Sequence, residues 1–193
     1  MKKAIYLVVI LALSVFTTAC INNLAVQELN NKAAEYMKEG DYENAISRLK
    51  SSVDLDGNIF ETQYNLAVAY TENGDYEEAM EAFEKASALN PNSKELSYSK
   101  AVMFENYARD LFTGNTKAQK EALEDDDEQN VDEEFKPSEV EIEDVKKYYA
   151  AAVENYSKYL ESNVPTEEAS EIRDRIKDIE EKLEVLDSEV ATN

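Results

Sequence analysis

The chain has 193 residues and a formal net charge of −22, with 42 Asp and Glu against 20 Lys and Arg. Such a surface repels nucleic-acid phosphates and anionic lipid headgroups, which excludes both as partners and favours basic ligands. Glycine and proline are scarce, while Ala, Glu, Leu and Lys are plentiful, so the composition predicts an all-α protein.

The first nineteen residues have the order of features that export requires. Lys2 and Lys3 precede an uncharged apolar run over residues 4–16, and the small residues 17–19 follow. That run is too short for a helix to cross about 30 Å of hydrocarbon, but it suits the apolar region of a signal peptide. Residues 1–19 are therefore predicted to be a signal peptide. The alternative is an uncleaved membrane anchor with Cys20 as an ordinary buried thiol.

Ala19-Cys20 after small residues and an apolar stretch resembles the lipobox of bacterial lipoproteins, although Thr17 stands where leucine is usual. The resemblance implies a diacylglycerol on the Cys20 thiol and a second acyl chain, such as palmitate, on its amine; two chains anchor stably. Residues 20–25 would be a short tether. We expect a lipid anchor in the cell membrane or outer membrane, on the exported side. In the Gram-negative lipoproteins that this segment resembles, an aspartate directly after the lipidated cysteine is a signal for retention in the inner membrane. Ile21 stands at that position here, which favours the outer membrane or the cell surface.

A shift of 34 residues aligns the sequence with itself over residues 26–93. It brings Gly40-Asp41-Tyr42-Glu43 onto Gly74-Asp75-Tyr76-Glu77, and it also pairs Ala33 with Ala67 and Ala45 with Ala79. Each unit is predicted to be two antiparallel helices joined where glycine takes the left-handed conformation. The alanines would lie where helices approach closely, and Pro91 would follow the end of a helix.

This pattern resembles the tetratricopeptide repeat family, most closely over residues 60–93 and less so over 26–59, where Lys32 and Gly57 depart from it. The resemblance implies a right-handed α-solenoid of antiparallel helix pairs that binds proteins. The alternative is a generic array of helical hairpins with an accidental period.

Residues 94–165 are interpreted as a degenerate third unit with an acidic insertion at about 113–137. No glycine stands in the turn position, so the first helix of this unit is expected to continue to about Phe112. The polar stretch that follows predicts a short helix over residues 117–123. Ser138 and Glu141 form a capping-box signature. The carboxylates of residues 125–128 suit calcium, but the run lacks the glycine of an EF-hand loop, so a solvated acidic loop without metal is favoured.

A final helix is predicted over 166–187, capped by Thr166, with a disordered tail at 188–193. Its apolar residues recur at heptad spacing: Ala169, Ile172, Ile176, Ile179, Leu183 and Leu186. The seam predicts a capping helix that covers the last repeat. The alternative is a coiled coil that forms a homodimer.

In the tetratricopeptide repeat family, the first helices of successive units line a concave groove that holds peptides. By position, the groove here would be lined by Asn30, Met37, Glu61, Tyr64, Val68, Thr71, Glu95, Tyr98, Val102 and Glu105. Tyrosines and valines between glutamates predict an apolar track with a negative rim, suited to a neutral or basic segment of another envelope protein. Alternatively, these residues are merely exposed helix surface.

The chain contains no histidine, no tryptophan, one cysteine and four glycines. These counts argue against catalysis and cofactor binding. The sequence therefore predicts a membrane-anchored scaffold or adaptor that binds protein partners. Two other hypotheses are a structural lipoprotein that self-associates through its last helix and a calcium-responsive surface protein.

Overall fold

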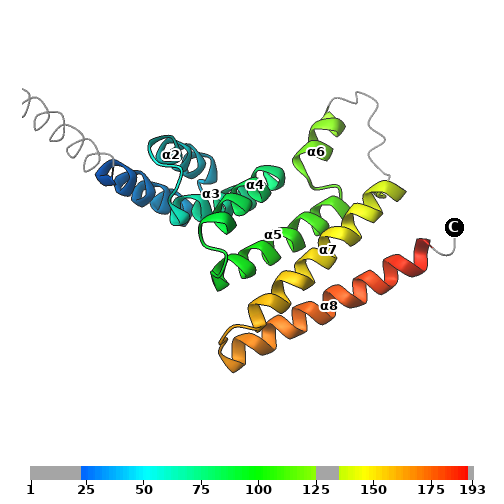
Figure 1. Ribbon diagram of the computed structural model, residues 1–193. Coiled ribbons are helices and arrows are strands. Elements are labelled where there is room, and N and C mark those ends of the chain that lie inside the picture. The colour runs from blue at the N-terminus through cyan, green and yellow to red at the C-terminus, as the bar shows by residue number, and fades with distance from the viewer. Residues whose placement is uncertain (1–22, 125–134, 191–193) are drawn as a thin grey trace, which may run out of the picture.

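The structure, a computed structural model, describes residues 23–124 and 135–190, and all of its regular elements are helices. A first helix over 23–39 is followed by α2 (Tyr42–Leu55), α3 (Phe60–Asn73), α4 (Tyr76–Leu89), α5 (Lys94–Phe112), α6 (Lys117–Glu124), α7 (Glu139–Leu160) and α8 (Thr166–Val190) (Figure 1). Successive long helices pair in antiparallel fashion and α8 covers the end of the array. The predicted right-handed α-solenoid with a C-terminal capping helix is confirmed.

The two Gly-Asp turns adopt the same backbone conformation. Gly40 and Gly74 have φ values of 75° and 78°, in the left-handed region, as predicted. After each glycine the next amide donates back to a carbonyl five residues earlier: Asp41 N to Tyr36 O and Asp75 N to Tyr70 O, both at 2.9 Å. This pattern ends the first helix of each unit and reverses the chain.

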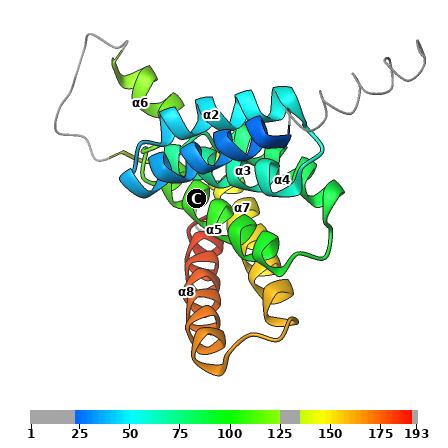
Figure 2. The same ribbon diagram turned by 90° about the vertical axis from the view of Figure 1, so that its left-hand side faces the viewer.

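Two hydrophobic cores share α5 as a common wall. The first lies among the N-terminal helix and α2–α5 and is centred on the fully buried Leu49 and Phe83, with the predicted close-contact alanines around them: Ala33, Ala45, Ala67 and Ala79. The second lies among α5, α7 and α8, and Tyr156 and Ile179 are fully buried in it. Phe104 of α5 packs against both cores. The repeats and the α7–α8 hairpin therefore lie on opposite sides of α5 (Figures 1 and 2).

The α5 helix is longer than its counterpart in the second repeat, with 19 residues against 14. Ala108, fully buried, stands where Gly74 ends α3, so α5 continues to Phe112 before the left-handed Gly114 ends it. The ring of Phe135 covers that glycine so closely that an added Cβ would lie 2.6 Å from its Cγ atom. Phe135 thus returns the chain to the end of α5 before α7 begins.

The short helix α6 is fixed to the edge of the second repeat. Lys117 forms an ion pair with Asp75, and the Gln119 amide donates to Leu111 O and to the Glu141 carboxylate. At the start of α7, Ser138 and Glu141 form the predicted capping box. Hydrogen bonds with Ser138 and Gln119 hold the pKa of Glu141 below its usual range.

Three predicted boundaries need correction. The first helix includes residue 23, within the predicted tether 20–25, because Val26 already packs into the interior with 5% of its surface exposed. Thr166 is the first residue of α8 and not its cap, since Ala169 N donates to Pro165 O. Finally, α8 continues to Val190 rather than ending at 187, because burial of Leu186 holds its last turns against α7.

Several predictions concern parts of the chain outside the described residues. These are the signal peptide at 1–19, Cys20, the acidic run at 125–128 and the end of the predicted tail at 191–193.

Replacement of Gly74 with alanine should destabilise the fold by about 1 kcal/mol, because an L-residue is strained at a φ of 78°. Gly57→Ala is the matched control, since Gly57 lies outside the left-handed region and its new Cβ would make only ordinary contacts. Urea unfolding followed by far-UV circular dichroism measures both variants. Equal losses of stability would contradict the assigned role of the Gly-Asp turn.

Candidate functional site

The groove residues of the first two units fall into an interior set and an exposed set. The Asn30 amide donates to the buried hydroxyls of Ser52 and Thr62, at 2.8 and 3.0 Å, so it links three helices. Thr71 is buried and donates to Ala67 O. These two predicted lining residues are therefore structural, because their side chains point between helices.

Four other predicted residues of these units lie at or near the surface. Met37 and Val68 are half-buried and pack on the edge of the first core, whereas Glu61 is exposed. Tyr64 is half-buried, stacks on Phe60 with ring centroids 5.8 Å apart, and shares a hydrogen bond with Ser99. A partner could contact this part of the predicted groove without displacing another helix.

The third unit provides much less open surface than predicted. The ring of Tyr98 lies 6.0 Å from that of Tyr156 and 5.3 Å from that of Tyr159, both on α7, and Val102 packs on the second core. Glu105 accepts a hydrogen bond from Tyr156 and lies 3.5 Å from the Arg175 guanidinium of α8. The protein's own C-terminal helices therefore occupy this part of the groove.

Glu95, the remaining predicted residue, is exposed in the first turn of α5. Hydrogen bonds from its own backbone amide and from Ser93 lower the pKa of its carboxyl group. Its negative charge acts on Tyr159 of α7, so Glu95 lies near the start of the third unit and the helices that cover it.

Carboxylates at the helix interfaces are bound by tyrosine hydroxyls. Within residues 23–124 and 135–190, four such bonds join different helices: Tyr76 to Asp110 at 2.5 Å, Tyr107 to Glu77 at 2.9 Å, Tyr156 to Glu105 at 2.6 Å and Tyr159 to Glu168 at 2.7 Å. Hydrogen bonding to Glu168, together with burial, raises the pKa of Tyr159 to about 12. Burial and their carboxylate partners also raise the pKa values of the other three tyrosines. All four hydroxyls therefore keep their protons at neutral pH and act as donors.

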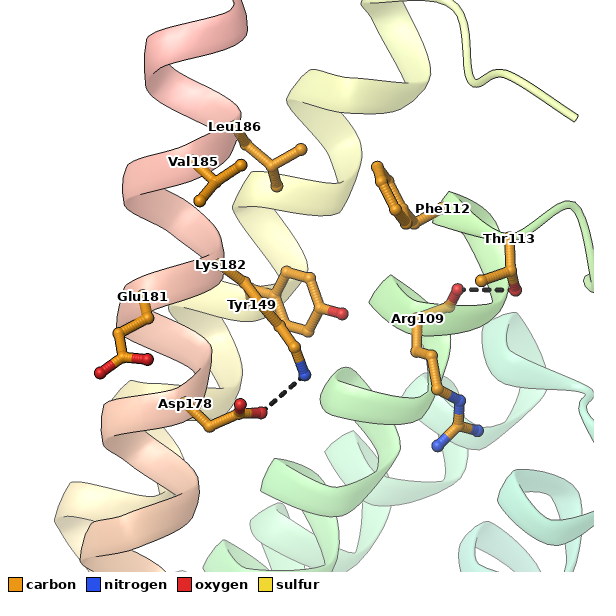
Figure 3. A pocket seen from close by; sticks show the side chains of 9 residues that line it. All are labelled: Arg109, Phe112, Thr113, Tyr149, Asp178, Glu181, Lys182, Val185 and Leu186. Atoms are coloured by element: carbon orange, nitrogen blue, oxygen red, sulfur yellow. Dashed lines mark hydrogen bonds and ion pairs between the residues drawn. The ribbon is translucent and has the colours of Figure 1, made fainter. Parts of the chain in front are cut away.

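A pocket of about 460 Å³ opens where α8 diverges from the end of α5, with α7 behind it. We call it the α5–α8 pocket. Its lining combines apolar and charged side chains: Arg109, Phe112, Thr113, Tyr149, Asp178, Glu181, Lys182, Val185 and Leu186 (Figure 3). Phe112 faces Val185 and Leu186 across the opening, and the Tyr149 hydroxyl points into the space between the helices.

The sequence prediction did not include this pocket. One of its walls exists because α5 runs on past the position of the repeat glycine, which places Arg109 and Phe112 beyond the end of a normal first helix. The sequence signal for this wall is the lack of a glycine at position 108, which indicates that α5 continues past the usual turn. The other wall is the C-terminal part of α8, and its distance from α5 depends on packing that the sequence pattern does not specify.

A second pocket of about 330 Å³ is polar and lies between the ends of α3 and α5, beside α6. It contains Glu72, Asn106 and Asp110 together with Arg109 and Lys117. Two of its three cations are paired, Arg109 with Asp110 and Lys117 with Asp75, and Lys120 is the third. This polar pocket lies at the end of the second repeat.

The described residues contain no cluster of three or more acidic or cysteine side chains that could hold a metal ion. In the same ranges, no helix is both long enough and apolar enough to cross a bilayer.

Comparison with protein families decides the nature of the repeats. Models of the tetratricopeptide repeat match residues 29–59 and 60–93, the latter with the predicted bounds of the second unit. The chain contains two tetratricopeptide repeats. Tetratricopeptide repeats are protein-interaction modules and typically not catalytic, so this region indicates a scaffold that binds proteins.

No curated protein matches the chain. Among solved structures, two of MamA are similar. "MamA 41-end from Desulfovibrio magneticus RS-1" is 19% identical, with 83% of this chain and 95% of that chain covered and a TM-score of 0.38. "MamA RS-1 ArsTM double mutant" is 18% identical, with coverage of 82% and 96% and the same TM-score. Scores this low do not establish a common arrangement of the tetratricopeptide repeats and the helices that follow them.

Two buried tyrosines of α7 should respond differently to loss of the hydroxyl. Tyr156→Phe should destabilise the protein by about 2 kcal/mol, because Glu105 loses a charge-assisted donor at a helix interface. Tyr149→Phe should change stability by less than about 0.5 kcal/mol, because its hydroxyl has no hydrogen-bond partner in the described part of the chain. Urea unfolding of both variants provides the comparison, and a large loss for Tyr149→Phe would disprove the assignment.

Proposed function

We propose that the protein is a lipid-anchored interaction scaffold of the bacterial cell envelope, held in the cell membrane or outer membrane on the exported side. The observation that carries the proposal is the pair of tetratricopeptide repeats at residues 29–93. The anchor is inferred from the signal-like residues 1–19 and from Cys20. Since the first helix is already present at residue 23, at most two residues separate it from Cys20, and acylation would hold the repeats close to the bilayer.

The partner is proposed to be a neutral or basic segment of another envelope protein. On the second unit, Tyr64 and Val68 are half-buried, and Glu61 of the same helix is an exposed carboxylate. The net charge of −22 attracts basic segments at long range and repels nucleic acid. Contact with such a surface requires no movement of α7 or α8.

Self-association through α8 is the weaker hypothesis. The heptad seam that motivates it is already packed into the second core of the same chain, where Ile172, Ile179 and Leu186 are buried and Ile176 and Leu183 pack beside them. A coiled-coil dimer would have to detach α8 from α7. The apolar seam of α8 therefore packs inside its own chain as a cap, which favours the scaffold hypothesis over self-association.

Lipidation is tested by the variant Cys20→Ser in the native host, with radiolabelled palmitate and membrane flotation as the two measurements. The unaltered protein should carry label and float with membranes, and Cys20→Ser should lose both properties because no other thiol exists in the chain. Asn22→Ser is the matched control and should retain them. A labelled Cys20→Ser protein would refute the anchor.

The interaction role is tested by a photoreactive residue at position 61, which is exposed on α3, with position 84 on α4 as the control. Both positions are exposed glutamates, but only Glu61 lies at the predicted groove. Illumination of cells should give a discrete crosslinked product from position 61 and none from position 84. Identical products from both sites would contradict a partner in the groove.

A further inference from the structure

None of the residues that line the α5–α8 pocket belongs to the predicted groove, and the pocket opens beside the second core, to which Tyr149 and Leu186 belong. We infer that it binds a basic amphipathic segment of a partner protein, which inserts a large apolar side chain between Phe112 and Val185 and offers a hydrogen-bond acceptor to Tyr149. This inference rests on the proposed scaffold function and specifies a second contact and its chemistry.

The apolar walls of the pocket are open to solvent although they are formed by large side chains. Phe112 is 39% exposed and Val185 is 56% exposed, and Phe112 faces Val185 and the buried Leu186 beside it across the opening (Figure 3). A volume of about 460 Å³ accommodates a large side chain and part of its backbone. Filling the pocket would remove both exposed residues from water.

The polar requirement comes from Tyr149. This residue is 4% exposed and its hydroxyl points into the pocket, yet that hydroxyl has no hydrogen-bond partner among the residues that the structure describes. By contrast, Tyr156 and Tyr159 on the same helix both donate to carboxylates. The hydroxyl is not among the fully buried polar atoms that lack a partner, so it is accessible from the pocket, and a carbonyl oxygen of a bound segment could accept a hydrogen bond from it.

The charges around the pocket argue against an acidic occupant. Its two cations are already neutralised, since Lys182 lies 2.7 Å from Asp178 and Arg109 lies 3.1 Å from Asp110. What remains is the field of a chain with a net charge of −22, which favours a segment rich in lysine or arginine. The same field opposes a second copy of this chain, because two such copies repel each other.

The test measures binding of a fluorescein-labelled 14-residue amphipathic peptide of leucine, alanine and lysine to the purified full chain, by fluorescence anisotropy. A peptide with glutamate in place of lysine is the charge control. Phe112→Ala should weaken binding of the lysine peptide about tenfold or more. Leu89→Ala is the matched control, because Leu89 is 38% exposed and lies on α4, away from the pocket; it should bind unchanged.

Tyr149→Phe should weaken the same binding about threefold or more while leaving the unfolding midpoint unchanged, which separates a ligand contact from a structural role. Equal effects of Phe112→Ala and Leu89→Ala, or equal binding of the glutamate peptide, would overturn the inference. So would a dimer, detected by sedimentation, that Phe112→Ala dissociates, since the occupant would then be a second copy. If these results fail while position 61 still crosslinks, the scaffold proposal stands and only the pocket assignment falls.

Discussion

The architecture depends on a single helix being buried on two sides. One face of α5 closes the core of the tetratricopeptide repeats, and the other face supports α7 and α8, with Phe104 in contact with both cores. A helix in this position cannot present an open binding face along its whole length. The exposed residues of α5 lie at its two ends, and its last turn projects beyond the normal length of a repeat helix. The partly open surface of the second repeat and the α5–α8 pocket both follow from this constraint.

An excess of acid shapes the way the helices are joined. With 42 acidic and 20 basic residues, there are too few cations to pair with every carboxylate one to one, and a bare carboxylate at a helix interface would be unfavourable. Tyrosine resolves this conflict, because its ring fills the interface while its hydroxyl donates to the carboxylate. Tyr159–Glu168 and Tyr107–Glu77 are such pairs, because neither carboxylate forms an ion pair within residues 23–124 and 135–190. Tyr149 is on the same helix as Tyr159 but donates to no carboxylate among the described residues, and its hydroxyl faces the α5–α8 pocket.

The fold was predictable because its signals are local. The spacing of Gly40 and Gly74 sets the turns, and the alanines at the same interval mark the close helix contacts. The groove was predictable only in part. Tyr64 and Tyr98 occupy equivalent positions in the repeat and are both half-buried, yet Tyr64 contacts residues of α3, α4 and α5, whereas Tyr98 contacts two rings of α7. That difference is created by helices distant in sequence, and so is the pocket between Phe112 and Val185. Repeat register places a residue on a face, but tertiary packing determines whether the face stays open.

The contact between Phe135 and Gly114 has a consequence for how this chain can change over evolution. Because the ring lies directly on the glycine, the two ends of the acidic insertion are brought together by their own contact. The entropy of closing a loop grows only slowly with its length, by about 0.6 kcal/mol for each doubling. Residues can therefore be added to or removed from the middle of this segment with little effect on the helices that it connects. The end of α5 is thus a point at which a repeat protein can acquire new sequence while its solenoid stays intact.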